Sequence, residues 1–132
     1  MLPISFISDA VYVVNSKTSG RGVYTNKGLE ANMVIEIAAV IVMSAKDRKL
    51  LDQTLLHDYI FEWGVQKNQC CMALGYVSLY NHSYNSNCTY DMDFKKKTIT
   101  ITTTRKIKKG EELFINYNGD PDKETPVWFD AK

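Results

Sequence analysis

The segment Asn81-His82-Ser83-Tyr84-Asn85-Ser86-Asn87-Cys88-Thr89-Tyr90 (NHSYNSNCTY) decides how this chain is interpreted. It gathers amides, hydroxyls, an imidazole and two phenols directly after the apolar run 70–80. A buried polar side chain costs free energy unless it finds a hydrogen-bond partner. The segment therefore predicts either a tightly self-satisfied turn or a site whose partners come from a ligand.

Two further islands favour a site over a turn. Gly20-Arg21-Gly22 has two glycines, which let a ligand approach the backbone closely and expose its amides. Gly110–Tyr117 (GEELFINY) is the other island. Taken alone, the glycine pair is also typical of a plain β-turn, and it lacks the third glycine and the helix of a dinucleotide fingerprint.

Composition predicts one globular domain over residues 1–132, with 45% hydrophobic residues. A net charge of +1 favours neither nucleic acid nor a membrane surface as a partner. Lysines gather at 95–97 and 105–109, with acidic residues nearby in the sequence. This pattern indicates a solvated hairpin of mixed charge, or alternatively a basic patch for an acidic partner.

The three cysteines predict no disulfide framework, because Cys70 and Cys71 are adjacent and Cys88 is isolated. Without a C-x-x-C pair, we expect no structural metal. Reduced thiols and the lack of a signal-peptide pattern indicate an intracellular protein, cytoplasmic or nuclear and not secreted. The longest apolar run, 33–43, is interrupted by Glu36 and is shorter than the ~20 residues that span a bilayer.

The hydrophobic pattern predicts a mostly β domain with one main helix. From Leu51 to Trp63 apolar residues recur at helical spacing, and Gly64 follows as a stop. Ser44 or Asp47 could instead cap an earlier turn. Short strands are expected at 4–7, 11–15, 22–25, 33–42 (one strand or a pair), 87–94, 98–104 and 113–117. β-branched residues mark the strands at 4–7 and 11–15 and dominate 33–42, and 87–94 and 98–104 are expected to form a hairpin across Lys95–Lys97.

The candidate functional side chains each have a structural alternative. His82 fits a general base, a metal ligand or a satisfied core imidazole, and Asn81 could merely cap a turn. The only other histidine in the sequence is His57, so a multi-histidine metal site is not available. The tyrosines suit a core or an interface, but also an aromatic channel for a long cationic side chain. Those near the three islands are Tyr59, Tyr80, Tyr84, Tyr90 and Tyr117.

In this order, GRGVY, ALGYVSLYNHSYNSNC and KKGEELFINY resemble the SET-domain protein lysine methyltransferases, especially the minimal viral and bacterial members. The resemblance covers about residues 17–119. The family motif N-H-S-x-x-x-N falls on Asn81, His82, Ser83 and Asn87, and G-E-E-L-x-x-x-Y falls on Gly110–Leu113 and Tyr117.

The resemblance implies a β-clip fold, in which several small curved sheets surround a C-terminal pseudoknot. It implies S-adenosylmethionine as methyl donor, S-adenosylhomocysteine as product, no metal, and a protein lysine as acceptor, with a histone tail as one option. A homodimer is plausible by analogy with small members.

Roles carried over from the family follow the motifs. Gly20, Arg21 and Gly22 would lie along the methionine part of the cofactor. Asn81 and His82 would contact its adenosine end. In the tail 120–132, Trp128 or Phe129 could cover the adenine, or could simply pack.

Three tyrosines would form the catalytic end. By resemblance, Tyr117 would lie beside the transferring methyl group, while Tyr90 and Tyr59 would border the lysine channel. Many members have cysteine and proline where this chain has Tyr84 and Ser86. These departures leave a non-catalytic interaction module as the alternative to an enzyme.

Overall fold

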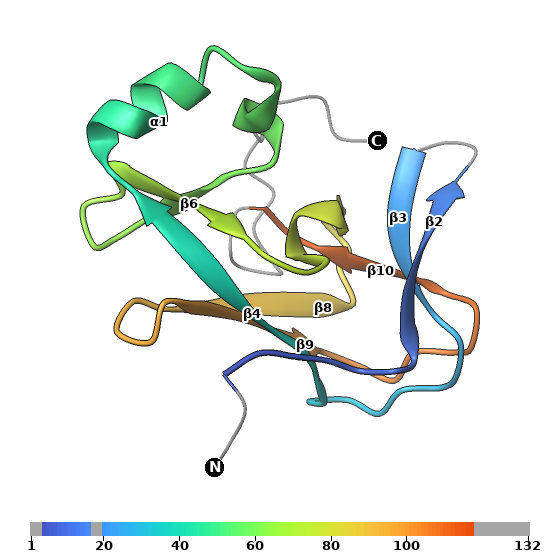
Figure 1. The fold of residues 1–132 in the computed structure, drawn as a ribbon. Helices are drawn as coiled ribbons and strands as arrows, with labels where there is room; N and C mark the ends of the chain where they lie inside the picture. Colours follow the sequence, from blue (N-terminus) through green and yellow to red (C-terminus); the bar gives the residue numbers. More distant parts are fainter. Residues whose placement is uncertain (1–3, 17–19, 118–132) are drawn as a thin grey trace.

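Two curled sheets form the fold, and a short helix lies at the corner opposite the smaller sheet (Figure 1). The computed structural model describes residues 4–16 and 20–117. The larger sheet runs β5-β6-β4-β9-β8 with β1 on β4, and the smaller runs β2-β3-β10-β7. The strands are β1 Phe6–Ile7, β2 Val11–Ser16, β3 Gly20–Thr25, β4 Val34–Met43, β5 Phe61–Trp63, β6 Gln69–Ala73, β7 Asn81–His82, β8 Cys88–Asp93, β9 Thr98–Thr103 and β10 Glu112–Ile115.

The mostly β prediction is confirmed. β4 is one continuous strand, since its β-branched residues pair with β9 on one side and with β6 on the other. The predicted hairpin of β8 and β9 forms across residues 94–97, where Lys97 turns the chain at φ 57°. β3 begins at Gly20 rather than at the expected residue 22, so the glycine pair Gly20 and Gly22 lies in a strand and not in a plain β-turn.

The helix predicted over Leu51–Trp63 is wrong in position. Helix α1 spans Ala45–Leu51, and the Ser44 side chain caps it by accepting from the Asp47 N–H at 3.1 Å. A 3₁₀ turn, η1 Leu55–Asp58, follows, and β5 then begins at Phe61. The apolar residues of this stretch serve different purposes: Leu55 is 77% exposed, whereas Phe61 and Trp63 are buried on one face of a strand.

A second 3₁₀ turn, η2 Val77–Leu79, leads into a crossing of chain segments. β10 inserts between β3, to which it is antiparallel, and β7, to which it is parallel. The Asn87 side chain binds β10 through both of its polar atoms: Nδ2 donates to the Glu112 carbonyl at 2.9 Å and Oδ1 accepts from the Phe114 N–H at 2.8 Å. The 81–87 segment is therefore fastened to the last strand.

The core lies between the two sheets and is built from β-branched and leucine side chains such as Val23, Ile35, Ile101 and Leu113. Cys70, Cys71 and Cys88 are free thiols buried in the same interior. In the described part of the chain, no helix has the length and apolar character needed to cross a membrane.

Candidate functional site

A pocket of about 450 Å³ opens where the start of β3, the end of η1, η2, β7 and Tyr117, two residues after β10, come together. The glycine island, the NHS segment and the final tyrosine, distant in sequence, all contribute to its wall. The lining residues are Asn15, Gly20, Arg21, Asp58, Tyr59, Ser78, Leu79, Asn81 and Tyr117.

A polar junction forms one side of this pocket. Asn81 Nδ2 donates to the Arg21 carbonyl at 3.1 Å and to Glu112 Oε2 at 2.7 Å. Tyr24 donates its hydroxyl to the other oxygen, Glu112 Oε1, at 2.9 Å. A Cβ at Gly22 would lie 2.7 Å from Glu112 Oε2, so the strand passes over the carboxylate only because residue 22 lacks a side chain.

His82 is a neutral, buried imidazole. Its Nδ1 accepts a hydrogen bond from the Tyr117 backbone N–H at 3.0 Å, which places the proton on Nε2 in the neutral ring. Burial lowers the pKa of His82. Within the described ranges Nε2 has no hydrogen-bond partner, and the Tyr84 ring packs against the imidazole with centroids 4.5 Å apart. The geometry makes His82 a clamp on Tyr117 rather than a base.

Tyr117 is fixed at both its backbone and its phenol. The Tyr117 hydroxyl donates to the Tyr80 carbonyl at 2.5 Å. The Tyr117 backbone carbonyl accepts from the Tyr90 hydroxyl at 3.2 Å. Burial raises the pKa of Tyr90 to about 12 and that of Tyr117 well above its ordinary value. Both phenols therefore stay neutral at physiological pH. The Phe61 ring closes the group, 5.6 Å from the Tyr90 centroid and 6.5 Å from that of Tyr117.

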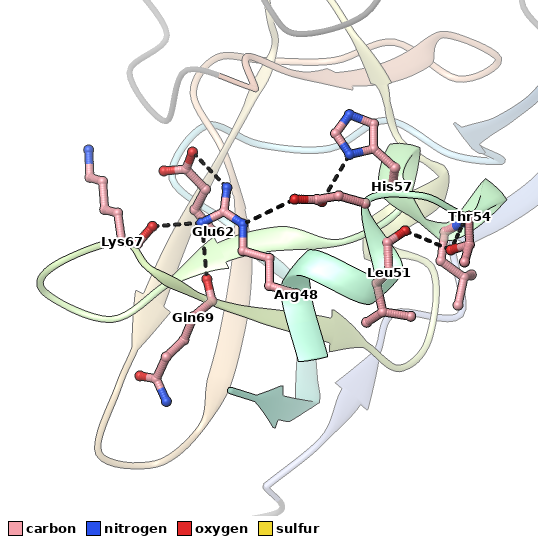
Figure 2. A network of polar contacts seen from close by, with 9 residues as sticks. Arg48, Leu51, Thr54, His57, Glu62, Lys67 and Gln69 are labelled. Carbon is pink, nitrogen blue, oxygen red and sulfur yellow. Dashed lines mark hydrogen bonds and ion pairs between the residues drawn. The ribbon is translucent and has the colours of Figure 1, made fainter. Parts of the chain in front are cut away.

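A polar network around Arg48 holds the segment that carries Tyr59 and Phe61 (Figure 2). Exposed ion pairs contribute at most about 1 kcal/mol each, so the network acts mainly by joining elements. His57 lies in this network and binds Asp52 Oδ1 at 3.0 Å; it does not line the pocket. The partners of Arg48 are the carbonyls of Lys67 and Gln69 and the carboxylates of Glu62 and Asp52.

The sequence profile of the SET domain matches residues 20–118, which is more than half of the chain. The chain belongs to the SET-domain family of lysine methyltransferases. This confirms the resemblance inferred from the three motifs, as well as the enzyme class that it implied.

Similar proteins agree with this SET-domain assignment. The histone-lysine N-methyltransferase of Schizosaccharomyces pombe that is H3 lysine-37 specific is 31% identical over 128 residues, covering 96% of this chain and 82% of that protein. Human histone-lysine N-methyltransferase 2D is 32% identical over 120 residues, 83% of this chain but 2% of its own length.

Solved structures show the same SET fold. A Plasmodium falciparum protein, described as a candidate histone methyltransferase, aligns with a TM-score of 0.64 and 27% identity over 84% of this chain and 95% of that one. A humanized mutant of the Chaetomium thermophilum Polycomb Repressive Complex 2 aligns with a TM-score of 0.69 and 18% identity, over 83% of this chain and 15% of that one, and supports the fold alone.

The SET-domain pocket brings most of the expected site residues together. Gly20, Arg21, Asn81, Tyr59 and Tyr117 line it. Three more of the expected residues do not line the pocket but lie next to residues that do. These three are Gly22, His82 and Tyr90. Trp128 is not among the residues that the structure describes.

Three positioning residues had no predicted role. Glu112 joins Asn81 to Tyr24, Asn87 fastens β10, and Tyr80 accepts from Tyr117. Glu112 and Asn87 lie inside the motifs and could have been singled out as polar residues beside apolar ones. Tyr80 acts at the pocket through its backbone carbonyl, and sequence carries no signal for that.

Among residues 4–16 and 20–117, no group of three or more His, Cys, Asp or Glu side chains is placed to hold a metal ion.

Proposed function

We propose that this SET domain transfers a methyl group from S-adenosylmethionine to the ε-amine of a lysine in a histone. The observation that carries the proposal is the shared pocket, where the glycine strand, Asn81 and the Tyr117 phenol converge on one space. In a SET-domain methyltransferase, the methyl donor and the lysine acceptor must meet in one space, and this pocket offers such a space.

The residues present fit an amino-acid-bearing cofactor. Arg21 and Asp58 both line the pocket and offer a cation and a carboxylate, complementary to an amino acid's carboxylate and ammonium. The missing side chain at Gly22 keeps the backbone beside Asn81 and Glu112 accessible. We propose that Gly20, Arg21, Gly22, Asn81 and His82 hold the cofactor, which when bound supplies an activated methyl group on a sulfonium.

The chain's own residues then govern the amine. Free lysine has a pKa of about 10.4, and an apolar aromatic wall disfavours its charged form. Neutral Tyr117 and Tyr90 phenols remain hydrogen-bond donors throughout the physiological pH range. No side chain at the pocket is assigned as a general base. Alignment of the reacting groups can lower a barrier by up to about 7–11 kcal/mol, and we assign that task to Tyr117.

Tyr90 and Tyr59 would border the acceptor side. The Tyr90 hydroxyl is held on the Tyr117 carbonyl, and Tyr59 lines the pocket itself. A fixed hydroxyl there limits the space available to an amine that already carries methyl groups. We therefore propose that Tyr90 sets how many methyl groups are added.

The two departures from the family pattern do not open the site. Ser86 is buried, and its carbonyl accepts from Arg105 Nη1 at 3.0 Å, which holds the turn without a proline. Tyr84 packs on His82. These contacts favour the enzyme over a non-catalytic interaction module.

We propose one SET domain over residues 1–132, with Trp128 or Phe129 as a cover for the cofactor. A histone substrate, suggested by the names of the relatives, would place the protein in the nucleus on chromatin. A homodimer remains part of the proposal by analogy.

Radiolabelled methyl transfer to core histones tests the function directly. Wild-type protein should label a histone, and mass spectrometry should place the label on lysine. A cell lysate serves as the wider substrate source. If peptide binding persists while no lysine in either source is labelled, the interaction-module interpretation replaces the enzyme.

A further inference from the structure

A buried carboxylate, that of Glu36, lies in the interior and is not part of the pocket lining. Glu36, in the middle of β4, is 0% exposed. The residues that pair with it on the neighbouring strands, Ile7 of β1 and Ile101 of β9, are apolar. An ionisable group in such a place is costly and needs specific partners. The core would accept an aliphatic side chain at this position more readily.

Glu36 accepts hydrogen bonds from both ends of the turn at residues 76–80, which leads into β7. Its Oε2 accepts from the Tyr76 backbone N–H at 2.8 Å, and its Oε1 accepts from the Tyr80 hydroxyl at 3.1 Å. Gly75 lets the turn approach: a Cβ there would lie 2.4 Å from Oε2, and its φ is 87°. Both carboxylate oxygens are thus committed to the segment 75–80.

The same segment ends at the candidate active site. The Tyr80 ring is fully buried, and its carbonyl accepts the 2.5 Å hydrogen bond of the Tyr117 hydroxyl. A single residue, Tyr80, therefore connects the Glu36 carboxylate to the Tyr117 phenol. Moving the Tyr80 side chain would move the carbonyl on which that phenol depends.

We propose that Glu36 is a positioning residue for methyl transfer, which holds the 75–80 turn so that the Tyr80 carbonyl orients the Tyr117 hydroxyl. This inference rests on the proposed function. Glu36 acts through Tyr80 and does not touch the pocket.

Because Glu36 can ionise, its effect on the orientation of Tyr117 should depend on pH. Burial raises its pKa from 4.5 to about 7. The titratable group that contacts Glu36 is the Tyr80 phenol, and the Cys88 thiol and the Tyr76 phenol act on Tyr80 in turn. Protonation would change Oε1 from a pure acceptor into a possible donor toward Tyr80, so the alignment of Tyr117 responds to pH near neutrality.

Three variants separate positioning from a merely structural role. Glu36→Gln keeps an oxygen for the Tyr76 N–H and an amide that can donate to the Tyr80 oxygen, but it cannot ionise. Glu36→Leu removes both contacts at similar volume. Tyr80→Phe removes one hydroxyl and leaves the backbone carbonyl. Glu30→Gln, at an exposed carboxylate paired with Lys106, is the matched control.

Steady-state methylation of a histone peptide should show a split between kcat and KM. We expect Glu36→Leu to lower kcat at least 10-fold and Tyr80→Phe about 3- to 10-fold, with KM and the calorimetric Kd for S-adenosylhomocysteine within 2-fold. Glu36→Gln should recover most of kcat and flatten the pH profile between about pH 6 and 8. Equal kcat in wild type and Tyr80→Phe, or an unaltered pH profile in Glu36→Gln, would overturn the proposal.

Hydrogen exchange provides a readout that needs no turnover. In Tyr80→Phe, peptides covering 75–82 and 117 should exchange faster, while those covering β2 should not change. Unaltered exchange in 75–82 would refute the positioning role of Glu36 even if the wild type proved inactive on every substrate. Wild-type inactivity with the expected exchange pattern would instead refute the proposed function, while the role of Glu36 in holding the 75–80 turn would stand.

Discussion

The hydroxyl of Tyr117 donates a 2.5 Å hydrogen bond to the backbone carbonyl of Tyr80, 37 residues earlier in the chain. This bond ties the segment that follows the last described strand to the turn that leads into the NHS segment. Because the phenol is largely buried and its pKa is raised, it remains a donor over the whole physiological range. Tyr117 thus reaches the pocket in one protonation state and one orientation.

Replacing Tyr117 by phenylalanine should lower kcat about 10- to 100-fold and leave cofactor affinity within about 2-fold. The ring would stay in place against Phe61 and His82, while the oriented hydroxyl would be lost. Peptide methylation and calorimetry with S-adenosylhomocysteine measure the two effects. Tyr12→Phe, on β2, is the control, and equal losses in both measurements would contradict the role.

Replacing Asn81 by alanine should weaken cofactor binding before it affects turnover at saturation. The amide holds both the Arg21 carbonyl and Glu112 Oε2, so its loss frees the glycine strand and leaves Glu112 one partner short. We expect a rise in Kd of about 10-fold, measured by calorimetric titration. Asn85→Ala, an exposed position in the same segment, should bind as the wild type does. An unchanged Kd for Asn81→Ala would remove it from the binding site.

Gly22→Ala and Gly28→Ala form a matched pair. The new Cβ at position 22 would lie 2.7 Å from Glu112 Oε2 and 3.1 Å from Asn81 Nδ2, whereas at position 28 it would meet only the Ile107 carbonyl at 3.7 Å. We expect Gly22→Ala to weaken S-adenosylhomocysteine binding at least 10-fold and Gly28→Ala to leave it unchanged. Equal affinities for the two variants would show that Glu112 and Asn81 can move to accept a side chain at position 22 without weakening cofactor binding.

Tyr90→Phe should shift the product toward higher methylation states. Its hydroxyl is held on the Tyr117 carbonyl at 3.2 Å, and removing it frees space on the acceptor side. Mass spectrometry of a methylated peptide over time should show more di- or trimethyllysine than the wild type gives. An identical product distribution, at any total rate, would count against Tyr90 as the residue that limits methyl number.

Glu36 should make stability fall as pH rises. Its pKa is about 7 in the folded protein and near 4.5 when unfolded, so the native state binds the extra proton between these values. The stabilisation is complete below about pH 4.5 and is lost as pH rises through about 7, a change of about 3 kcal/mol. Denaturant titrations at about pH 5 and pH 8 should therefore show a larger drop for the wild type than for Glu36→Gln. Glu30→Gln should keep the wild-type drop, and equal drops in all three proteins would contradict the assignment.

Local sequence rules predicted the strands better than the helix. β-branched residues predicted β4, where they dominate, and β9, where Ile99 and Ile101 alternate with threonines and are buried. The helix prediction for 51–63 was wrong because Leu51, Leu55 and Trp63 have helical spacing but differ in burial: Leu51 is half-buried, Leu55 is exposed and Trp63 is buried. Spacing reports which residues could share a face, and burial decides whether they do.

The sequence by itself determined the family, the mostly β class and the motifs that line the pocket, because these depend on residue types at short spacing. Only the tertiary structure decided which atoms meet: the parallel pairing of β7 with β10, the Glu112 link to Asn81, and the Glu36–Tyr80–Tyr117 connection. Such contacts join segments far apart in the chain, and in the last connection a backbone carbonyl carries the contact. Every residue has that carbonyl, so only its place in the fold makes the one at Tyr80 different from the rest.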